Sequence, residues 1–385
     1  MTKTPYYFYN LDLLNDTLSS LHSNIKGTNF RVHYAVKANC NQEILETISH
    51  SDLGADCVSA GEIKWALEAG FEPKDIVFAG VGKTDEEINY ALEHEVGMIH
   101  CESLQEILVI DELAKARNTF AKIALRLNPN VNPLTHEKIS TGLKENKFGL
   151  TTIEFKELIT LYPELSHVQI MGMHFHIGSQ IQDMSVFVEL CERINELAGV
   201  FEEHIGPFQY LNVGGGLGID YYEPDVNPIP DFKNYFDVFK DCLTIDKDIP
   251  VHFELGRSIV AQCGSLHTKV LYIKKSEHKN FAVLDAGMTE LLRPALYNAY
   301  HKIDRLDIEN APIQMMEYDI VGPICESSDC FGKDILLPEL KRGDILTIQS
   351  CGAYAESMSL NYNGREKIES HVFSKRKEEM IYSAI

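Results

Sequence analysis

The chain has 385 residues, of which 44% are hydrophobic and 24% charged, so it is long enough for a large domain and a smaller partner domain with a sizeable core. Its formal net charge of −22, without any Lys/Arg-rich run, argues against nucleic acid and anionic membranes as partners. We find no signal peptide, no apolar stretch of membrane length, and neither CxxC pairs nor Cys/His clusters among nine cysteines, which predicts a cytoplasmic protein with free thiols.

Short apolar runs rich in β-branched residues alternate with helical patterns, which is typical of repeated βα units around a parallel sheet. Helical segments such as Asp85–His94 and Met184–Phe201 separate these runs. Eight runs favour a (β/α)8 TIM-type barrel over an open doubly wound sheet. The predicted strands cover residues 32–36, 53–58, 76–80, 97–101, 122–127, 170–176, 209–213 and 251–255.

After the eighth run the pattern changes to further strands without long helices, which predicts a C-terminal β domain. The N-terminal run Tyr6-Tyr7-Phe8-Tyr9 precedes the first barrel strand, and we expect it to pair with this domain. The predicted division is an N-terminal segment over 1–25, a barrel over 26–260 and a β domain over 261–385. The strand-like runs of the β domain are 268–273, 280–284, 315–321 and 344–349.

The ends of the seventh and eighth predicted strands form a candidate phosphate site. Strand seven runs into Gly214-Gly215-Gly216 and strand eight into Glu254-Leu255-Gly256-Arg257, where barrel enzymes commonly bind phosphate. Glycines let backbone N–H groups approach an anion, and a guanidinium adds charge-assisted hydrogen bonds. A dinucleotide motif would need glycine at position 219, which is Ile219, whereas a plain tight turn stays possible for the glycines alone.

Lys37 closes the first predicted strand, where a lysine is either a solvated strand end or an amine kept in a pocket for Schiff-base chemistry. The sixth strand carries His174 and His176, and the strand period of two puts both on one face. Such a pair also suits a zinc site, but the ends of the other strands supply no further His or Asp ligands. The sequence therefore predicts no metal.

Glu254 has a predicted role if the site binds a pyridine ring. A carboxylate beside the ring nitrogen keeps that nitrogen protonated and makes the ring a strong acceptor of electrons. A strand-end glutamate in water is the alternative, and it stays open on this residue alone.

Several ordered motifs resemble those of the fold type III pyridoxal-phosphate (PLP) enzymes, which include alanine racemase and the ornithine, arginine and diaminopimelate decarboxylases. The resemblance is strongest to the diaminopimelate decarboxylases and covers nearly the whole chain. It implies PLP-dependent decarboxylation of meso-2,6-diaminopimelate to L-lysine. The motifs are Tyr34–Asn39, Gly54–Ile63, Asn128–Leu150, His174–Gln180, Gly214–Ile219, Glu254–Arg257, Leu292–Tyr297, Cys325–Asp329 and Gly352–Asn363.

For the barrel, the resemblance implies that Lys37 is the Schiff-base lysine, that His176 stacks on the cofactor ring and that Glu254 pairs with the ring nitrogen. It further implies a group of residues that hold the phosphate, namely Ser179, Gly214, Gly215, Gly216, Gly256 and Arg257.

For the β domain, the resemblance implies that Cys325 is the general acid and that Glu326 binds the distal ammonium, both reaching into the partner subunit's site in a homodimer. Arg293 and Tyr297, together with Arg257, are expected to bind the distal carboxylate of the substrate. Tyr354 is expected to contact both cofactor and substrate.

Two departures from the family and three rival functions remain at this stage. Leu255 stands where many relatives have proline, and the chain is short for the family, especially at its N-terminus.

A decarboxylase of another basic amino acid or of a carboxylated polyamine would leave Arg293 without a carboxylate to bind. A racemase prefers arginine at the ring nitrogen, where this chain has Glu254, and a catalytically silent regulator would be expected to lose Lys37 or Cys325.

Overall fold

The computed structural model describes residues 3–128, 147–306 and 314–375, and the chain divides into two compact units. The barrel unit comprises Ser20–Gly218 and Asp231–Leu255. The sheet unit comprises Met1–Ser19, Ile219–Pro230 and Gly256–Ile385. Most of the motif Asn128–Leu150 lies outside the described residues.

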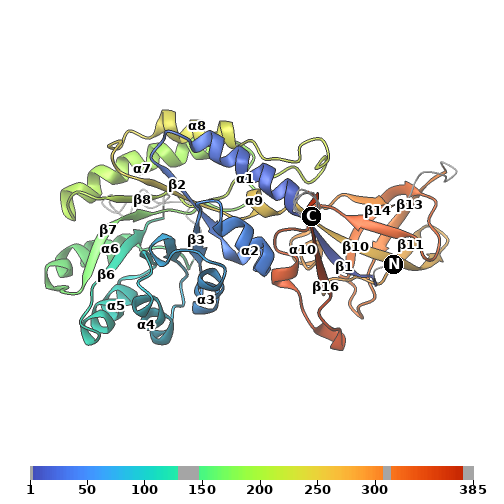
Figure 1. Ribbon diagram of the computed structural model, residues 1–385, viewed down its shortest axis with the longest axis horizontal. Helices are drawn as coiled ribbons and strands as arrows, with labels where there is room; N and C mark the ends of the chain where they lie inside the picture. The colour runs from blue at the N-terminus through green and yellow to red at the C-terminus, as the bar shows by residue number, and fades with distance from the viewer. Residues whose placement is uncertain (1–2, 129–146, 307–313, 376–385) are drawn as a thin grey trace, which may run out of the picture. The chain divides into compact units, whose positions relative to one another are not determined.

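The barrel unit is built on a closed barrel of parallel strands, β2 to β9 in chain order (Figure 1). Each of the predicted runs overlaps one of these strands, so the (β/α)8 prediction is confirmed. Most of the strands are buried along nearly their whole length, because helices cover their outer side and side chains fill the interior. The strands are β2 (Phe30–Ala35), β3 (Gly54–Cys57), β4 (Ile76–Phe78), β5 (Met98–Cys101), β6 (Ala121–Arg126), β7 (Val168–His174), β8 (Tyr210–Asn212) and β9 (Val251–Leu255).

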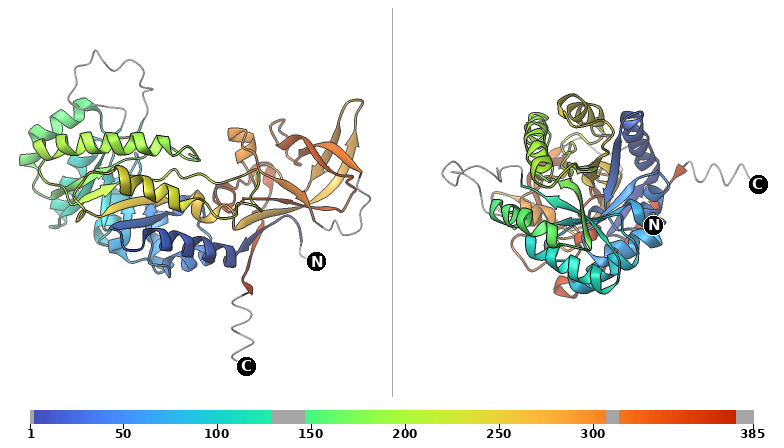
Figure 2. Two further views of the ribbon diagram at one scale, coloured as in Figure 1. Left: turned by 90° about the horizontal axis from the view of Figure 1, so that it is seen from above. Right: turned by 90° about the vertical axis from the view of Figure 1, so that its left-hand side faces the viewer.

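Helices follow the barrel strands and surround them, as the end-on view in Figure 2 shows. Polar side chains fix where several of them begin: Ser59, Thr84, Ser103 and Thr151 each accept a hydrogen bond from a backbone N–H in the first helical turn. None of the helices in the described ranges has the length and apolar character needed to span a membrane. The helices are α1 (Leu11–Ile25), α2 (Gln42–Ser49), α3 (Ala60–Glu68), α4 (Asp85–Glu93), α5 (Leu104–Ala116), α6 (Thr152–Leu161), α7 (Ser185–His204) and α8 (Phe232–Cys242).

The sheet unit contains an eight-stranded sheet in which the main path runs β12-β15-β10-β11-β13-β14. The four predicted runs correspond to β10, β11, β13 and β15, whereas β12, β14 and β16 were not predicted. Two short helices, α9 (Arg257–Val260) and α10 (Arg293–Tyr297), accompany the sheet. The strands are β10 (Gly264–Lys275), β11 (Asn280–Leu284), β12 (Ile303–Arg305), β13 (Met315–Val321), β14 (Cys330–Pro338), β15 (Ile345–Ile348) and β16 (Glu369–Phe373).

The N-terminal strand β1 (Tyr6–Asn10) belongs to this same sheet (Figure 1). It pairs antiparallel with β10, where Tyr6 lies opposite His267, and parallel with β16, where Tyr6 lies opposite Glu369. Tyr7 is fully buried, and its hydroxyl donates to the carbonyl of Glu290 at 2.6 Å. The first strand of the chain is therefore an interior strand of the sheet.

Candidate active site

Lys37 follows β2 in a short 3-10 turn, η1 (Val36–Ala38), and its side chain is 39% exposed. Its Nζ lies 3.2 Å from Oδ2 of Asp56, a fully buried residue of the neighbouring strand β3. Burial raises the pKa of Asp56, and so does the nearby charge of Glu254, while the Lys37 ammonium lowers it. The ion pair favours an amine held at the end of the barrel over a lysine directed into solvent.

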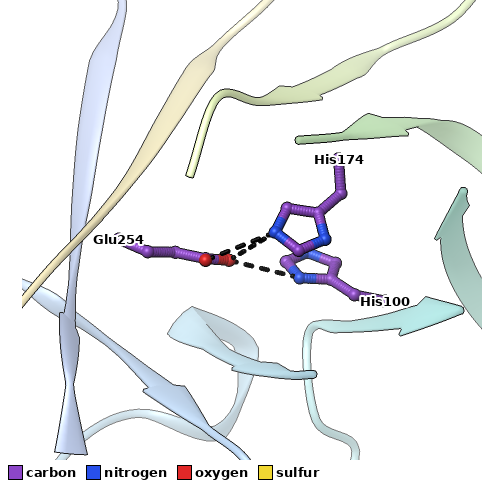
Figure 3. A group of neighbouring side chains, drawn as sticks. All are labelled: His100, His174 and Glu254. Carbon is purple, nitrogen blue, oxygen red and sulfur yellow. Dashed lines mark hydrogen bonds and ion pairs between the residues drawn. The ribbon is translucent and has the colours of Figure 1, made fainter. Parts of the chain in front are cut away.

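Glu254 on β9 is buried inside the barrel, whereas its neighbour Phe253 packs against the aromatic side chains of α8, as the alternation along a strand requires. The carboxylate accepts a hydrogen bond from Asn212 Nδ2 at 3.0 Å. His174 Nε2 and His100 Nδ1 each lie 3.3 Å from its Oε1 (Figure 3). A carboxylate buried among such groups is not a solvated strand end.

The glycines after β8 lie where the backbones of neighbouring loops approach most closely. A Cβ on Gly215 would lie 1.8 Å from the carbonyl oxygen of Glu254, and one on Gly214 would lie 2.2 Å from that of Phe175. Gly214 and Gly216 also have φ angles of 73° and 113°, which favour glycine. A larger residue would push these loops apart, so the triple glycine is required by this local packing as well as suited to an anion.

The two histidines of the sixth predicted strand have separate partners. β7 ends at His174, and His176 follows in the loop, where its Nδ1 accepts the Gly215 N–H at 3.4 Å. Burial lowers the pKa of His176 to about 4, so the ring is neutral near pH 7. Ser179 lies two residues after Ile177 in the same loop and is exposed.

His174 and His176 have different partners, so the structure does not bring them together as ligands of one zinc ion. Within the described residues, one buried group has the composition of a metal site, and it consists of His100, His174 and Glu254, with ligand atoms within 4.8 Å of one another. His100 was not considered from the sequence.

In the sheet unit, two arginines gather around Tyr221. Arg257 Nη1 donates to the Tyr221 hydroxyl at 2.6 Å, and the Arg293 guanidinium lies over the Tyr221 ring, 4.7 Å from its centroid. Arg257 also lies 4.9 Å from the ring centroid of Tyr354, whose φ of 58° is in the left-handed region. Arg293 Nη1 donates to His301 Nε2 at 2.6 Å. A pair of guanidinium groups has the charge and the hydrogen-bond donors that suit an anion.

Cys325 and Glu326 lie in a turn of the sheet unit that a buried aspartate organises. Asp329 accepts backbone hydrogen bonds from Ile324 at 2.7 Å and from Met288 at 2.6 Å. The Cys325 thiol is exposed. Glu326 is also exposed, as is Tyr297 on α10, at 63%. These three side chains are therefore available to a ligand or to another subunit.

Sequence reasoning missed several buried polar residues of the barrel unit. Asp56, His100 and Asn212 all lie on barrel strands and contact Lys37 or Glu254. All three lie inside runs that the sequence predicts to be buried. This position could have indicated a role, because a buried polar side chain needs a partner. Arg126 and Glu102 form a further buried ion pair at the ends of β6 and β5.

Comparison with known proteins agrees with this arrangement. Residues 11–261 match the family model "Pyridoxal-dependent decarboxylase, pyridoxal binding domain". The chain is 50% identical over 365 residues to a diaminopimelate decarboxylase of Bacteroides thetaiotaomicron, with 94% of each chain covered. It is 40% identical to that of Helicobacter pylori, covering 95% of this chain and 89% of the relative.

Solved structures give the same result. The structure of Helicobacter pylori diaminopimelate decarboxylase complexed with L-lysine superposes with a TM-score of 0.87 at 39% identity, covering 97% of this chain and 92% of the other. A lysine/ornithine decarboxylase of Vibrio vulnificus shares the fold at 20% identity, with a TM-score of 0.81. The chain therefore belongs to the diaminopimelate decarboxylases, a family of pyridoxal-dependent decarboxylases.

Proposed function

We propose that Lys37 carries the pyridoxal phosphate with which this chain decarboxylates meso-2,6-diaminopimelate to L-lysine and CO2. The observation that supports it most is the position of the Lys37 amine, 3.2 Å from buried Asp56 at the end of the first barrel strand. The related Helicobacter pylori enzyme was solved with L-lysine, the product of this reaction.

The residues of the barrel unit fit the cofactor. Gly214 and Gly215 leave no room for a Cβ at their closest contacts and Gly216 leaves little, so their backbone can approach a phosphate. Glu254 provides a buried carboxylate for a protonated ring nitrogen, and neutral His176 provides a flat ring beside the glycines. We propose that these groups bind the cofactor, together with a further set that holds its phosphate, namely Ser179, Gly256 and Arg257.

When bound, pyridoxal phosphate supplies an electron-withdrawing ring that accepts the electron pair left behind as CO2 departs. The chain's own residues would orient the reaction and return a proton. Glu254 keeps a negative charge at the ring nitrogen, and Cys325 Sγ donates the proton that replaces the lost carboxylate. The exposed thiol of Cys325 is accessible for this role.

The substrate's distal end would be bound by residues of the sheet unit. Arg257, Arg293 and Tyr297 would hold the distal carboxylate, since paired guanidinium groups match its geometry. Glu326 would bind the distal ammonium. Tyr354, close to Arg257, would contact cofactor and substrate.

We further infer that the chain works in the cytoplasm as a homodimer, in which Cys325 and Glu326 complete the partner subunit's site. The nine cysteines, all within the described ranges, are free thiols, which suits a reducing compartment. A net charge of −22 disfavours nucleic acid as a partner.

Borohydride reduction of the holoenzyme, followed by peptide mapping, tests the role of Lys37. The cofactor should be fixed on the peptide that contains Lys37, and Lys37→Ala should abolish turnover because it removes the amine that would hold the cofactor. Lys64→Ala, which removes an exposed lysine of α3, is the control and should leave turnover unchanged. A reduced adduct on any other lysine would refute the assignment.

A further inference from the structure

A buried network of polar side chains surrounds the Glu254 carboxylate. Asn212 Nδ2 donates to Oε1 at 3.0 Å, His174 Nε2 lies 3.3 Å from each carboxylate oxygen, and His100 Nδ1 lies 3.3 Å from Oε1. All four residues are at most 6% exposed. Figure 3 shows that both imidazole rings approach the carboxylate together, from β5 and β7.

The two imidazole rings are stacked on each other, and Tyr210 holds the ring of His100 in place. The ring centroids of His100 and His174 are 4.0 Å apart, with an interplanar angle of 25°. His100 Nε2 lies 2.9 Å from the Tyr210 hydroxyl, which accepts a hydrogen bond from Asn212 Nδ2 at 3.0 Å. Residues of β8 thus hold the stacked rings in place on the side away from the carboxylate.

Hydrogen bonds link these side chains into one network. Asn212 uses its two amide hydrogens on Tyr210 and Glu254, and the Tyr210 hydroxyl is hydrogen-bonded to His100 Nε2. The other ring nitrogen of His100, Nδ1, faces Glu254. His174 likewise points Nε2 at the carboxylate. His174 is therefore hydrogen-bonded to the carboxylate, and His100 Nδ1 lies beside it.

The charges agree with this arrangement. Burial lowers the pKa of His174 well below its ordinary value, and the Glu254 charge offsets only part of that effect. Burial raises the pKa of Glu254, but the attraction of His174 and the hydrogen bonds from both histidines outweigh it and hold that pKa well below the ordinary value. The carboxylate therefore stays ionised inside this network.

We propose that His100 and His174 are positioning residues, which hold the Glu254 carboxylate ionised and in one orientation for the ring nitrogen of pyridoxal phosphate. Arginine or lysine in their place would neutralise the carboxylate and weaken its hold on a protonated ring nitrogen. The two imidazole rings fix the carboxylate and leave its charge to the cofactor. The inference rests on the proposed role of Glu254.

Two pairs of variants separate hydrogen bonding from packing. His100→Asn keeps a nitrogen near the place of Nδ1, and His174→Gln keeps one near the place of Nε2, whereas His100→Leu and His174→Leu remove the donor at similar volume. We would measure the Kd of the apoprotein for PLP and the absorbance spectrum of the bound cofactor. Each leucine variant should bind PLP roughly tenfold more weakly with an altered spectrum, and each amide variant should stay within about threefold of wild type.

Glu254→Gln is the reference that separates the two proposals. If it leaves PLP affinity and spectrum unchanged, the proposed role of Glu254 is wrong. If it changes both while the leucine variants match wild type, the role of the histidines is wrong and that of Glu254 stands. If the amide variants lose as much PLP affinity as the leucine variants, the histidines act only through packing and the proposal is wrong. Thermal unfolding of each apoprotein identifies any variant that fails to fold.

The same three side chains have the composition of a metal site, and the test includes that alternative. Purified wild-type protein would be analysed for zinc after exhaustive dialysis. We expect no stoichiometric zinc. One ion per chain, absent from both leucine variants, would overturn the proposal, because a metal would then occupy the edge of Glu254 that the donors are inferred to fill.

Discussion

Tyr221 contacts two guanidinium groups of like charge. Arg257 donates to its hydroxyl, and Arg293 lies over its ring. Burial lowers the pKa of Arg293, and the charge of Arg257 adds to that effect. His301, whose pKa burial lowers to about 3, accepts the Arg293 hydrogen bond as a neutral ring and so does not compensate the charge. Two guanidinium groups beside one tyrosine favour an anion, such as the distal carboxylate of diaminopimelate.

Arg293→Ala should lower kcat/KM for meso-diaminopimelate on the order of a hundredfold, because a bidentate contact to a buried carboxylate contributes a few kcal/mol. Arg117→Ala, which removes a surface arginine paired with Glu93, is the matched control and should behave like wild type. Steady-state CO2 release measures both variants. A kcat/KM within about threefold of wild type for Arg293→Ala would mean that the distal carboxylate is bound elsewhere.

At this scale, the sequence predicts residues whose position at a strand end has a chemical meaning, such as Lys37 and Glu254. It does not predict His100 or Asp56, since a polar residue inside a buried strand does not reveal which neighbouring strand supplies its partner. His100 meets Glu254 only because the barrel closes and brings β5 and β9 to one interior. The resemblance to a family helped with Cys325 and Arg293, which patterns alone would have left as an ordinary thiol and a surface residue.

The elements of the barrel were easier to predict than those of the sheet. Buried parallel strands appear as continuous apolar runs, and side-chain caps mark the helices between them. β14 was missed because its burial pattern is mixed and Asp334 within it has a φ of 55°, which breaks the alternation. β12 has only three residues, too few to show a period.

The crowding after β8 leads to a prediction about one glycine. Gly215→Ala would place a Cβ 1.8 Å from the carbonyl oxygen of Glu254, so the loop after β8 must move. Forcing a methyl group into such a contact costs about 1–3 kcal/mol, and the shift of the loop should also weaken PLP binding. Thermal unfolding of the apoprotein and the Kd for PLP measure the two effects.

Gly199→Ala is the matched control, since Gly199 lies within α7 with nothing within 4 Å of the added Cβ. It should leave PLP binding unchanged and raise stability by roughly 0.5–1 kcal/mol, because alanine favours a helix. An unchanged Kd and unfolding midpoint for Gly215→Ala would show that the loop accommodates a side chain.

At the scale of the whole molecule, the proposed homodimer predicts complementation between two inactive variants. Lys37→Ala and Cys325→Ala chains should each fail alone, but a mixed dimer would have one site with both defects and one with neither. Random reassortment at equal amounts makes about half of the dimers mixed, so roughly a quarter of wild-type activity should return. Co-expression followed by CO2 release per site measures this.

A mixture of Lys37→Ala with itself, produced in two differently tagged forms, controls for the exchange procedure and should stay inactive. If subunit exchange is demonstrated and the mixed variants still recover no activity, Lys37 and Cys325 act within one chain or Cys325 is not the acid.

The position of β1 in the sheet has a consequence for synthesis on the ribosome. Its partners, β10 and β16, lie more than two hundred residues later in the chain, since Tyr6 pairs with His267 and Glu369. At about 5–20 residues per second, the strand emerges tens of seconds before its last partner exists. Meanwhile its apolar, aromatic edge is unpaired, so a nascent chain should need a chaperone at this strand more than at the barrel.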